Sequence, residues 1–443
     1  MIKTIRKIIP AVAALIIGGI SAFAFNAEAE ASDVNKKQIE GWNIAVTETE
    51  TVTGSAFTYN AYVSEDNKRA WIYNIEVDEK TDSSNLVIPA AINGKTVTKL
   101  GWVNVPRITA DDYFDEGFNR TIFGSWVEQC HGCPGYCREA SGIKYMTIPD
   151  TVTELQETAF SGMSNLRKVT IPDGVKDIPA ELFYGCDKLK SVKLPESMES
   201  FAPSALTDCP KLNKITLSGK CTNYSVNGKC LVYNKDKAVV FCFATGKKYN
   251  IPKGIKKINK YSFTNCIIKT VHIPASVNLI EGAAFHRSNG YSSRNIQNIT
   301  ISPKNKVYAK DGQTIFNKKD KSLTIAVIKW KNNKSKYVMS DKVKVLKNYS
   351  QSTINMDEYE EHIDKLYVSK NLKRVEEYGW GVVQNSANVY FTGKKVPKVS
   401  KKDPSYANLP IFADIHVPKA ADKQYKKLYR DNKMDDVDKW SVY

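Results

Sequence analysis

The stretch Leu166-Arg-Lys-Val-Thr-Ile-Pro-Asp173 decides the fold, because its pattern returns along the chain. Ile148-Pro149-Asp150 lies 23 residues before Ile171-Pro172-Asp173, and Leu194-Pro195-Glu196 lies 23 residues after it. The alternating residues Val169 and Ile171 mark one face of a short strand, and the proline that follows stops the strand from extending. One such unit cannot bury its own apolar face. The repetition therefore predicts a solenoid in which parallel strands of successive coils stack on one another.

Other copies of the pattern extend this prediction over most of the chain. The strand motif begins again at Leu189, Leu212, Ile268, Ile296 and Ile363. The second half of each unit carries an apolar anchor and an Ala-Phe pair, as at Ala159-Phe160 and Ala284-Phe285, which suggests a turn and a short helix. Ten or so coils with strands about 4.8 Å apart would form a rod roughly 50 Å long. One elongated solenoid thus replaces the two or three globular domains that 443 residues would otherwise suggest.

The repeated unit L-x-x-V-x-I-P-D-x-V-x-x-I-x-x-x-A-F-x-x-C resembles the BspA-like leucine-rich repeat family of bacterial surface and secreted proteins. The resemblance covers roughly residues 85 to 420 and implies a right-handed α/β solenoid with a role in adhesion or recognition. It places the family's structural ladder cysteine on Cys186, Cys209 and Cys266. The family shares no active site, so the resemblance supplies no catalytic residue.

The first 31 residues are predicted to be a signal peptide. Lys3, Arg6 and Lys7 precede an apolar run from Ile8 to Phe25, and small-residue cleavage patterns follow it. We therefore expect a secreted, extracellular protein, attached to the cell surface non-covalently if at all. No transmembrane segment is expected once the signal is removed.

The remaining organisation follows from where the repeat pattern holds and where it is interrupted. Asn227-Gly228 and Asp311-Gly312 are the dipeptides that type I′ hairpin turns favour, and β-rich runs flank both. The predicted segments are a β-rich N-terminal cap at 32–84, a first coil at 85–105, a cysteine-containing insertion at 106–140, a solenoid at 141–418 with hairpin insertions near 220–247 and 305–335, and a helical C-terminal cap or tail at 419–443.

The nine cysteines leave several pairings open. Cys130, Cys133 and Cys137, with His131 between them, form the only cluster with ligand chemistry. A local disulfide, a loop of free thiols and a weak zinc site are the three interpretations, although the second, distant ligand pair of a structural zinc site is missing. Cys221 and Cys230 could pair with each other or with Cys242. An odd number in an exported chain leaves at least one thiol free or intermolecular.

Part of the formal net charge of +17 collects on one predicted face. If the apolar residues of L-x-x-V-x-I point inward, 21 intervening positions of seven coils point outward, and they hold eight basic residues and one acid, Asp364. The basic residues are Lys144, Arg167, Lys168, Lys190, Lys193, Lys214, Lys269 and Lys365. A basic ribbon attracts acidic partners through its field. The alternative is that these lysines only keep the sheet face soluble.

These features favour a binding protein over an enzyme. The chain contains no G-x-S-x-G, H-E-x-x-H or P-loop motif, and we expect no catalysis, no cofactor and no bound metal. The expected partner of this monomer is an extracellular protein or an acidic polysaccharide, and nucleic acid does not fit an exported chain. Two alternatives stay open: an extracellular enzyme or accessory protein with activity in the N-terminal segment 32–140, and a structural component of a surface matrix.

Overall fold

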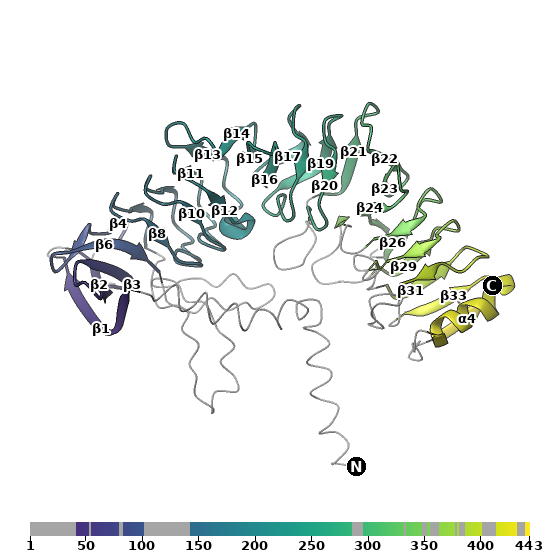
Figure 1. Cartoon of the computed structure of the whole chain (residues 1–443), viewed down its shortest axis with the longest axis horizontal. Coiled ribbons are helices and arrows are strands. Elements are labelled where there is room, and N and C mark those ends of the chain that lie inside the picture. Colours follow the sequence, from purple (N-terminus) through teal and green to yellow (C-terminus); the bar gives the residue numbers. More distant parts are fainter. Residues whose placement is uncertain are drawn as a thin grey trace, which may run out of the picture.

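The chain folds into a β-solenoid of about 11 turns with only 6% helix. The computed structural model describes residues 41–52, 55–78, 83–101, 142–285, 296–331, 334–347, 352–354, 363–376, 379–380, 386–400, 413–431 and 439–443. The coils follow an arc from the N-terminal strands to the C-terminal helix (Figure 1). A small rotation between successive coils accumulates into this curvature.

The N-terminal end is closed by a β-meander that continues into the solenoid. Strands β1 (Trp42–Thr51), β2 (Phe57–Ser64) and β3 (Arg69–Val77) are antiparallel, and β3 then pairs in parallel with β6 (Lys95–Leu100). β5 (Ala91–Ile92) and β8 (Glu154–Leu155) also pair with β6. Trp71 is fully buried and its Nε1 donates to the Gly101 carbonyl at 2.7 Å. The predicted β-rich cap thus covers the first coil.

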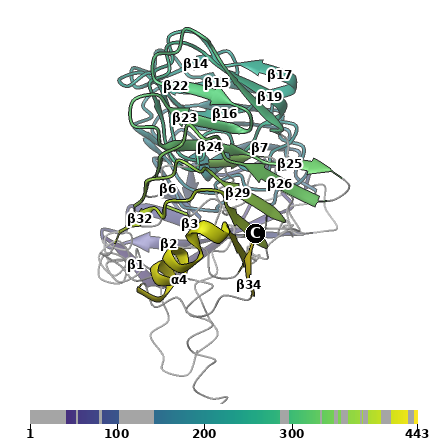
Figure 2. The same cartoon turned by 90° about the vertical axis from the view of Figure 1, so that its right-hand side faces the viewer.

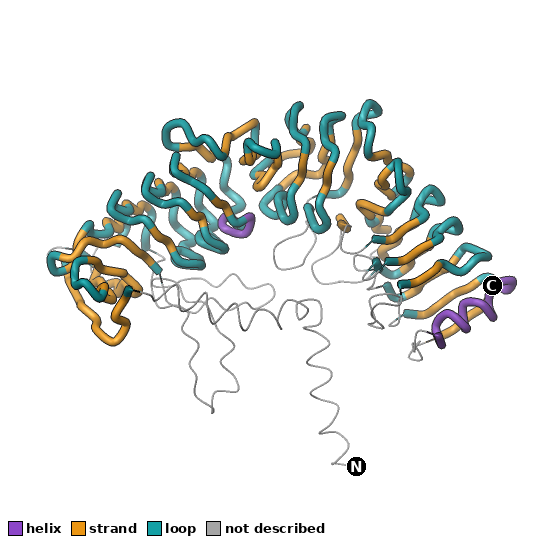
Figure 3. The backbone as a smooth tube through the Cα atoms, viewed as in Figure 1, coloured by secondary structure: helices purple, strands orange, loops and turns teal. Residues whose placement is uncertain are grey.

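A first column of strands runs along the solenoid in three sheets (Figure 3). The first sheet is parallel and contains β4 (Asn85–Val87), β7 (Tyr145–Thr147), β9 (Lys168–Thr170), β11 (Ser191–Leu194) and β13 (Lys214–Leu217). The second contains β17 (Thr245–Asn250), β19 (Ile267–Ile273) and β21 (Asn298–Ile301). The third contains β25 (Lys329–Lys331), β26 (Lys334–Val338), β29 (Lys365–Val368), β31 (Asn388–Phe391), β33 (Asp414–Val417) and β34 (Lys439–Val442).

A second column of two-residue strands forms another side of the coils. It contains β10 (Asp177–Ile178) and β12 (Ser200–Phe201), then β18 (Lys257–Ile258) and β20 (Leu279–Ile280), then β27 (Val345–Leu346), β30 (Arg374–Val375) and β32 (Lys398–Val399). The short helix expected in each unit is a run of turns in most of the described coils. The 3₁₀ helix at Pro203–Leu206 is an exception.

Both predicted hairpins are present, and they join the solenoid. β14 (Tyr224–Asn227) and β15 (Cys230–Tyr233) continue through β16 (Ala238–Cys242) into the sheet of β18 and β20. β22 (Tyr308–Asp311) and β23 (Thr314–Asn317) continue into β24 (Leu323–Val327) and β28 (Ser352–Ile354). Figure 2 places these hairpins on the opposite side of the molecule from β17, β19 and β25.

The predicted type of the hairpin turns is wrong. Asn227 pairs with Cys230 and Asp311 pairs with Thr314, so the central residues are Gly228-Lys229 and Gly312-Gln313. Among these four, only Gly228 and Gly312 have positive φ, at 61° and 57°. A glycine with positive φ at the first central position alone is the pattern of a type II′ turn, whereas type I′ needs positive φ at both.

The core repeats from coil to coil, as the sequence pattern predicts. The rings of Phe160 and Phe183 stack with their centroids 5.5 Å apart. The ladder cysteines are buried, and each thiol donates to a carbonyl of the preceding coil. Cys186 Sγ lies 3.4 Å from Phe160 O, Cys209 Sγ lies 3.1 Å from Phe183 O, and Cys266 Sγ lies 3.2 Å from Cys242 O. These thiols therefore fill the core and satisfy backbone oxygens.

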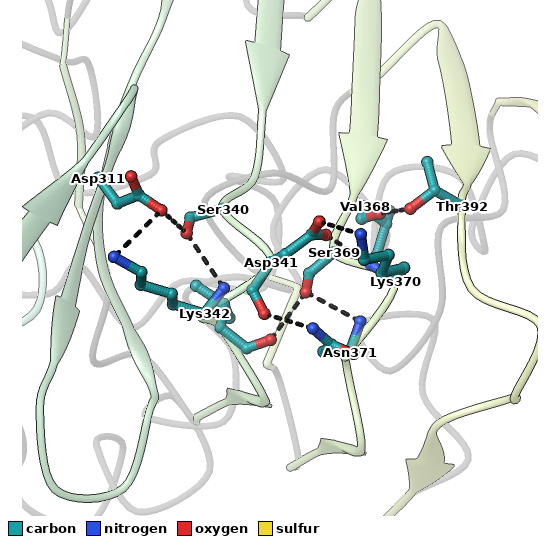
Figure 4. Close-up of polar contacts among 10 residues, drawn as sticks. Asp311, Ser340, Asp341, Lys342, Val368, Ser369, Lys370, Asn371 and Thr392 are labelled. Carbon is teal, nitrogen blue, oxygen red and sulfur yellow. Dashed lines mark hydrogen bonds and ion pairs between the residues drawn. The ribbon is translucent and has the colours of Figure 1, made fainter.

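Hydroxyl and carboxylate side chains join the turns of successive coils in the C-terminal half, where serine and threonine stand in place of the repeat proline (Figure 4). Ser369 Oγ donates to Val343 O at 2.8 Å, and Thr392 Oγ1 donates to Val368 O at 2.6 Å. Asp341 accepts from the backbone N–H of Lys370 at 3.2 Å and pairs with its Nζ at 2.9 Å. Each coil is thereby fixed to the one before it.

The C-terminal end combines a helix and a last strand. After a 3₁₀ turn at Lys419–Ala421, helix α4 (Asp422–Asp431) buries Tyr425 and Tyr429 against the last coils. The chain then returns as β34, which pairs with β33, so the predicted helical tail ends in a strand. Trp440 Nε1 donates to Asp422 Oδ1 at 2.8 Å and ties the helix to this strand. In the part of the chain that the structure describes, no helix is long and apolar enough to cross a membrane.

Candidate ligand-binding face

Six of the predicted basic residues lie together on the outward surface of the first sheet. Three of them lie on β9, β11 and β13, the other three lie just before β7, β9 and β11, and all six side chains are exposed. Below, the basic face means Lys144, Arg167, Lys168, Lys190, Lys193 and Lys214.

Strand register arranges the basic face in rows that run across the strands. Lys168, Ser191 and Lys214 are direct neighbours in one row. Thr170, Lys193 and Thr216 form a second row two residues further along the strands. Adjacent strands in a sheet lie about 4.8 Å apart, so charged groups repeat at multiples of that spacing.

A third row lies just before the strands and is held by backbone hydrogen bonds. The N–H of Arg167 donates to Lys144 O at 3.0 Å, and the N–H of Lys190 donates to Arg167 O at 2.9 Å. Asn213 continues the row, since its N–H donates to Lys190 O at 3.0 Å. The positions of these side chains are thus set by the coil stacking itself.

Carboxylates do not neutralise the basic face. Within the described residues, none of its six cations has an ion-pair partner. Several acids pair instead with lysines elsewhere on the coils. Lys99 contacts Glu154 at 2.7 Å, Lys176 contacts Glu199 at 2.8 Å, and Lys257 contacts Glu281 at 2.6 Å. The basic face therefore keeps its positive potential.

The other two predicted basic residues belong to different sheets. Lys269 is exposed on β19 and Lys365 is exposed on β29. The structure therefore brings six of the eight predicted residues into one surface and distributes the other two along the solenoid.

The sequence pattern missed further exposed lysines of the strand column. Examples are Lys247 and Lys248 on β17 and Lys336 on β26. In these coils tyrosine, Tyr249 or Tyr337, occupies the inward position that valine fills elsewhere. Ile251-Pro252 was the signal that could have identified the first of these strands.

The third sheet has a different outward surface, built on stacked rings. Tyr367 and Tyr390 have centroids 4.6 Å apart at an interplanar angle of 10°, and Tyr390 and His416 have centroids 4.1 Å apart at 8°. These three half-buried residues are called the aromatic row. Lys336 Nζ lies 4.6 Å from the centroid of Tyr367 at one end of it. The two faces of the Tyr390 ring are covered by Tyr367 and His416, so the aromatic row presents ring edges to solvent.

His416 is held within this row by polar contacts. Its Nδ1 lies 2.5 Å from Ser441 Oγ and its Nε2 lies 3.1 Å from Asn388 Oδ1. Burial lowers the pKa of His416, the nearby Asp414 carboxylate raises it, and Lys365 lowers it further. The net direction is down, so the folded protein favours the neutral imidazole.

The cysteine cluster at Cys130, Cys133 and Cys137 falls outside the described residues, as do the predicted signal peptide and the whole of the insertion at 106–140. Among the residues that are described, no group of three or more His, Cys, Asp or Glu side chains is placed to hold a metal ion.

Several solved bacterial structures resemble this chain at low sequence identity. A leucine-rich cell surface protein from Faecalibacterium prausnitzii is 16% identical, with 78% of this chain and 95% of that one covered and a TM-score of 0.37. The pneumococcal vaccine antigen PcpA is 13% identical, covering 89% and 98%, with a TM-score of 0.29. A leucine-rich repeat protein from Eubacterium ventriosum is 15% identical, covering 85% and 80%, with a TM-score of 0.29. No curated protein matches the sequence.

The sequence itself matches a family model directly. Six copies of the BspA type leucine rich repeat region cover residues 134–231 and 237–350. These ranges contain the 23-residue units, the ladder cysteines and the strands of the basic face. The repeats of this chain are therefore of the BspA leucine-rich repeat type.

Proposed function

We propose that this protein is a secreted or surface-associated recognition protein that binds an acidic extracellular partner, glycan or protein, on its basic face and acts without catalysis. The observation that carries the proposal is the set of six exposed cations in three rows, without acidic partners among the described residues.

The location outside the cell is supported by the N-terminal sequence and by similar proteins. Residues 1–31 have the charged, apolar and small-residue regions of a signal peptide. The similar protein of F. prausnitzii is described as a cell surface protein.

The spacing of the rows suits an extended polyanion or an acidic protein surface. Cations that repeat every one or two strands can each meet a sulfate or carboxylate without a deep pocket. Exposed charges separated by more than about 8 Å are largely screened at physiological salt, so such binding should weaken steeply as salt rises.

The test is elution from heparin and from polyglutamate columns with a salt gradient. The test variant carries Lys168→Glu, Lys190→Glu, Lys193→Glu and Lys214→Glu on the basic face. A matched variant carries Lys235→Glu, Lys253→Glu, Lys256→Glu and Lys373→Glu, which are exposed positions away from the first-column strands with the same change in net charge.

We expect the basic-face variant to elute at clearly lower salt than the wild type, with the matched variant in between and close to the wild type. Tighter retention on heparin would favour a glycan, and tighter retention on polyglutamate a protein surface. Equal loss in the two variants would show that net charge alone drives retention and would overturn the proposal.

A further inference from the structure

Two cysteines outside the ladder lie directly opposite each other in the first hairpin region. Cys230 on β15 pairs with Cys242 on β16 in the antiparallel register. Both side chains are fully buried, both are thiols in the structure, and both belong to the same apolar cluster. Their side chains therefore lie on the same, inward face of the two strands.

The backbone hydrogen bonds identify the kind of pair. The N–H of Phe243 donates to Lys229 O at 3.0 Å, and the N–H of Cys242 donates to Ser262 O at 2.7 Å. Cys230 and Cys242 are therefore a non-hydrogen-bonded pair, in which Cα atoms lie about 4.5 Å apart and side chains are closest. A disulfide spans Cα separations of about 4.4 to 6.8 Å, so this position meets its geometric requirement.

The Cys266 thiol also lies against that of Cys242, but Cys266 is not its cross-strand partner in the sheet. Cys266 is a ladder cysteine whose thiol donates to the Cys242 carbonyl at 3.2 Å. Cys221 packs against a different apolar cluster, with its Sγ directed to Met198 O on the preceding coil. Of the pairings open from sequence alone, the structure favours Cys230 with Cys242.

We propose that Cys230 and Cys242 form a cross-strand disulfide in the exported protein. The two thiols lose two protons and two electrons, and one S–S bond forms. The electrons pass by exchange to the disulfide of a thiol–disulfide oxidoreductase, which is reduced to a dithiol that takes up the two protons.

Burial determines when this reaction can take place. The pKa of both thiols is raised well above the usual cysteine value, by the mutual contact and burial for Cys230 and chiefly by burial for Cys242. Thiolate is the attacking species in exchange, so the folded core suppresses it. The bond should therefore form while the hairpin is still open to solvent, and it should resist reductants once the core has closed.

The position of the bond gives it a structural purpose. The turn that joins β15 to β16 lies between the two cysteines. A cross-link from Cys230 to Cys242 closes this turn and fixes the hairpin to the strand that continues into β18 and β20.

Peptide mapping of the protein exported by a bacterial host tests the proposal. Trypsin cleavage after lysine places Cys230 in 230–235, Cys242 in 238–247, Cys266 in 261–269 and Cys221 in 221–229. After unfolding and alkylation without reductant, we expect 230–235 and 238–247 to appear as one linked species that separates on reduction. Protein made in a reducing cytoplasm is the control and should give both peptides alkylated.

Accessibility provides a second readout. The linked species should persist in the folded exported protein under a reductant and disappear when the same reductant is added with denaturant. The double variant Cys230→Ala, Cys242→Ala should lose the linked species, while the ladder variant Cys209→Ala should keep it. Alkylation of both residues in the unreduced exported protein, or a linked pair that contains Cys266 or Cys221, would overturn the proposal, and the wild-type map decides this even if a variant does not fold.

Discussion

The first and third sheets of the strand column use the same repeat for different purposes. In both sheets the inward residues are buried apolar side chains, such as Val169 and Leu366. On the outward surface, the first sheet presents the dispersed cations of the basic face. The third sheet presents the aromatic row, whose rings lie 4.1 to 4.6 Å apart and are half-buried by one another.

The difference shows that a solenoid repeat constrains only the inward half of each strand. Like charges on the basic face repel and gain nothing from one another, so they add little to stability and remain available to a partner. The stacked rings contact each other, so they stabilise the last coils, where a linear array loses neighbours on one side. Recognition is therefore expected at the first sheet and reinforcement at the third.

Of the substitutions that test this comparison, the replacement of Tyr390 by alanine should lower stability the most. Tyr390 stacks on both Tyr367 and His416, and an aromatic pair contributes about 0.5–1.5 kcal/mol beyond its buried area. We expect Tyr390→Ala to lower the free energy of unfolding by about 1–3 kcal/mol in urea denaturation. Hydrogen exchange should quicken in β29, β31 and β33.

The matched change on the first sheet is Lys168→Ala. Lys168 is exposed and its row gains no contact from it, so the free energy of unfolding should change by less than about 0.5 kcal/mol. Equal effects of the two substitutions would contradict the division between a recognition surface and a reinforcing one.

The inward half of this architecture could be predicted because its residues recur at fixed spacing. The alternation of Val169 and Ile171 and the position of Pro172 specify strand, buried face and strand end within one unit. The basic face could be predicted as well, because the outward residues are those that lie between the buried ones. Coils in which Tyr249 or Tyr337 replaces valine were not recognised by the pattern, although a tyrosine ring fills the same inward site.

The aromatic row could not be predicted, because it depends on register between coils of unequal length. Tyr367 and Tyr390 are 23 residues apart, whereas Tyr390 and His416 are 26 apart, and the strands nevertheless align them. Sequence spacing alone would place His416 out of phase. The prediction of the hairpin turn type was wrong for a similar reason. The strand pairing is shifted by one residue, which places glycine at the first central position of each turn.

A smaller loss of stability is expected from a substitution in the turns that join coils of the third sheet. Ser369 Oγ donates to Val343 O at 2.8 Å and accepts from the N–H of Asn371 at 3.2 Å. Ser369→Ala should lower the free energy of unfolding by about 1–2 kcal/mol, because a buried carbonyl and an N–H lose their partner.

Ser191→Ala on the first sheet is its control. The Ser191 hydroxyl makes no hydrogen bond among the described residues, so its removal should cost less than about 0.5 kcal/mol. A loss as large as that of Ser369→Ala would mean that the strand hydroxyl of Ser191 contributes as much as the buried turn hydroxyl of Ser369.

The smallest expected effect is a pH dependence confined to the third sheet. The pKa of His416 lies below the ordinary histidine value of about 6.5, since burial and Lys365 outweigh the nearby Asp414 carboxylate. Between the folded and unfolded pKa values the unfolded chain binds more protons, so unfolding becomes easier as pH falls. The contribution of neutral His416 is therefore complete above the unfolded pKa and is lost as pH falls through the folded pKa.

Hydrogen exchange at pH values on either side of this window, corrected for intrinsic rates, should show β33 and β34 losing protection on acidification. His416→Gln should lose this response, because an amide keeps polar contacts to Ser441 and Asn388 without titrating. A loss of protection at β7, β9 and β11 equal to that at β33 would assign the pH response to the whole solenoid, and the contrast between the two sheets would fail.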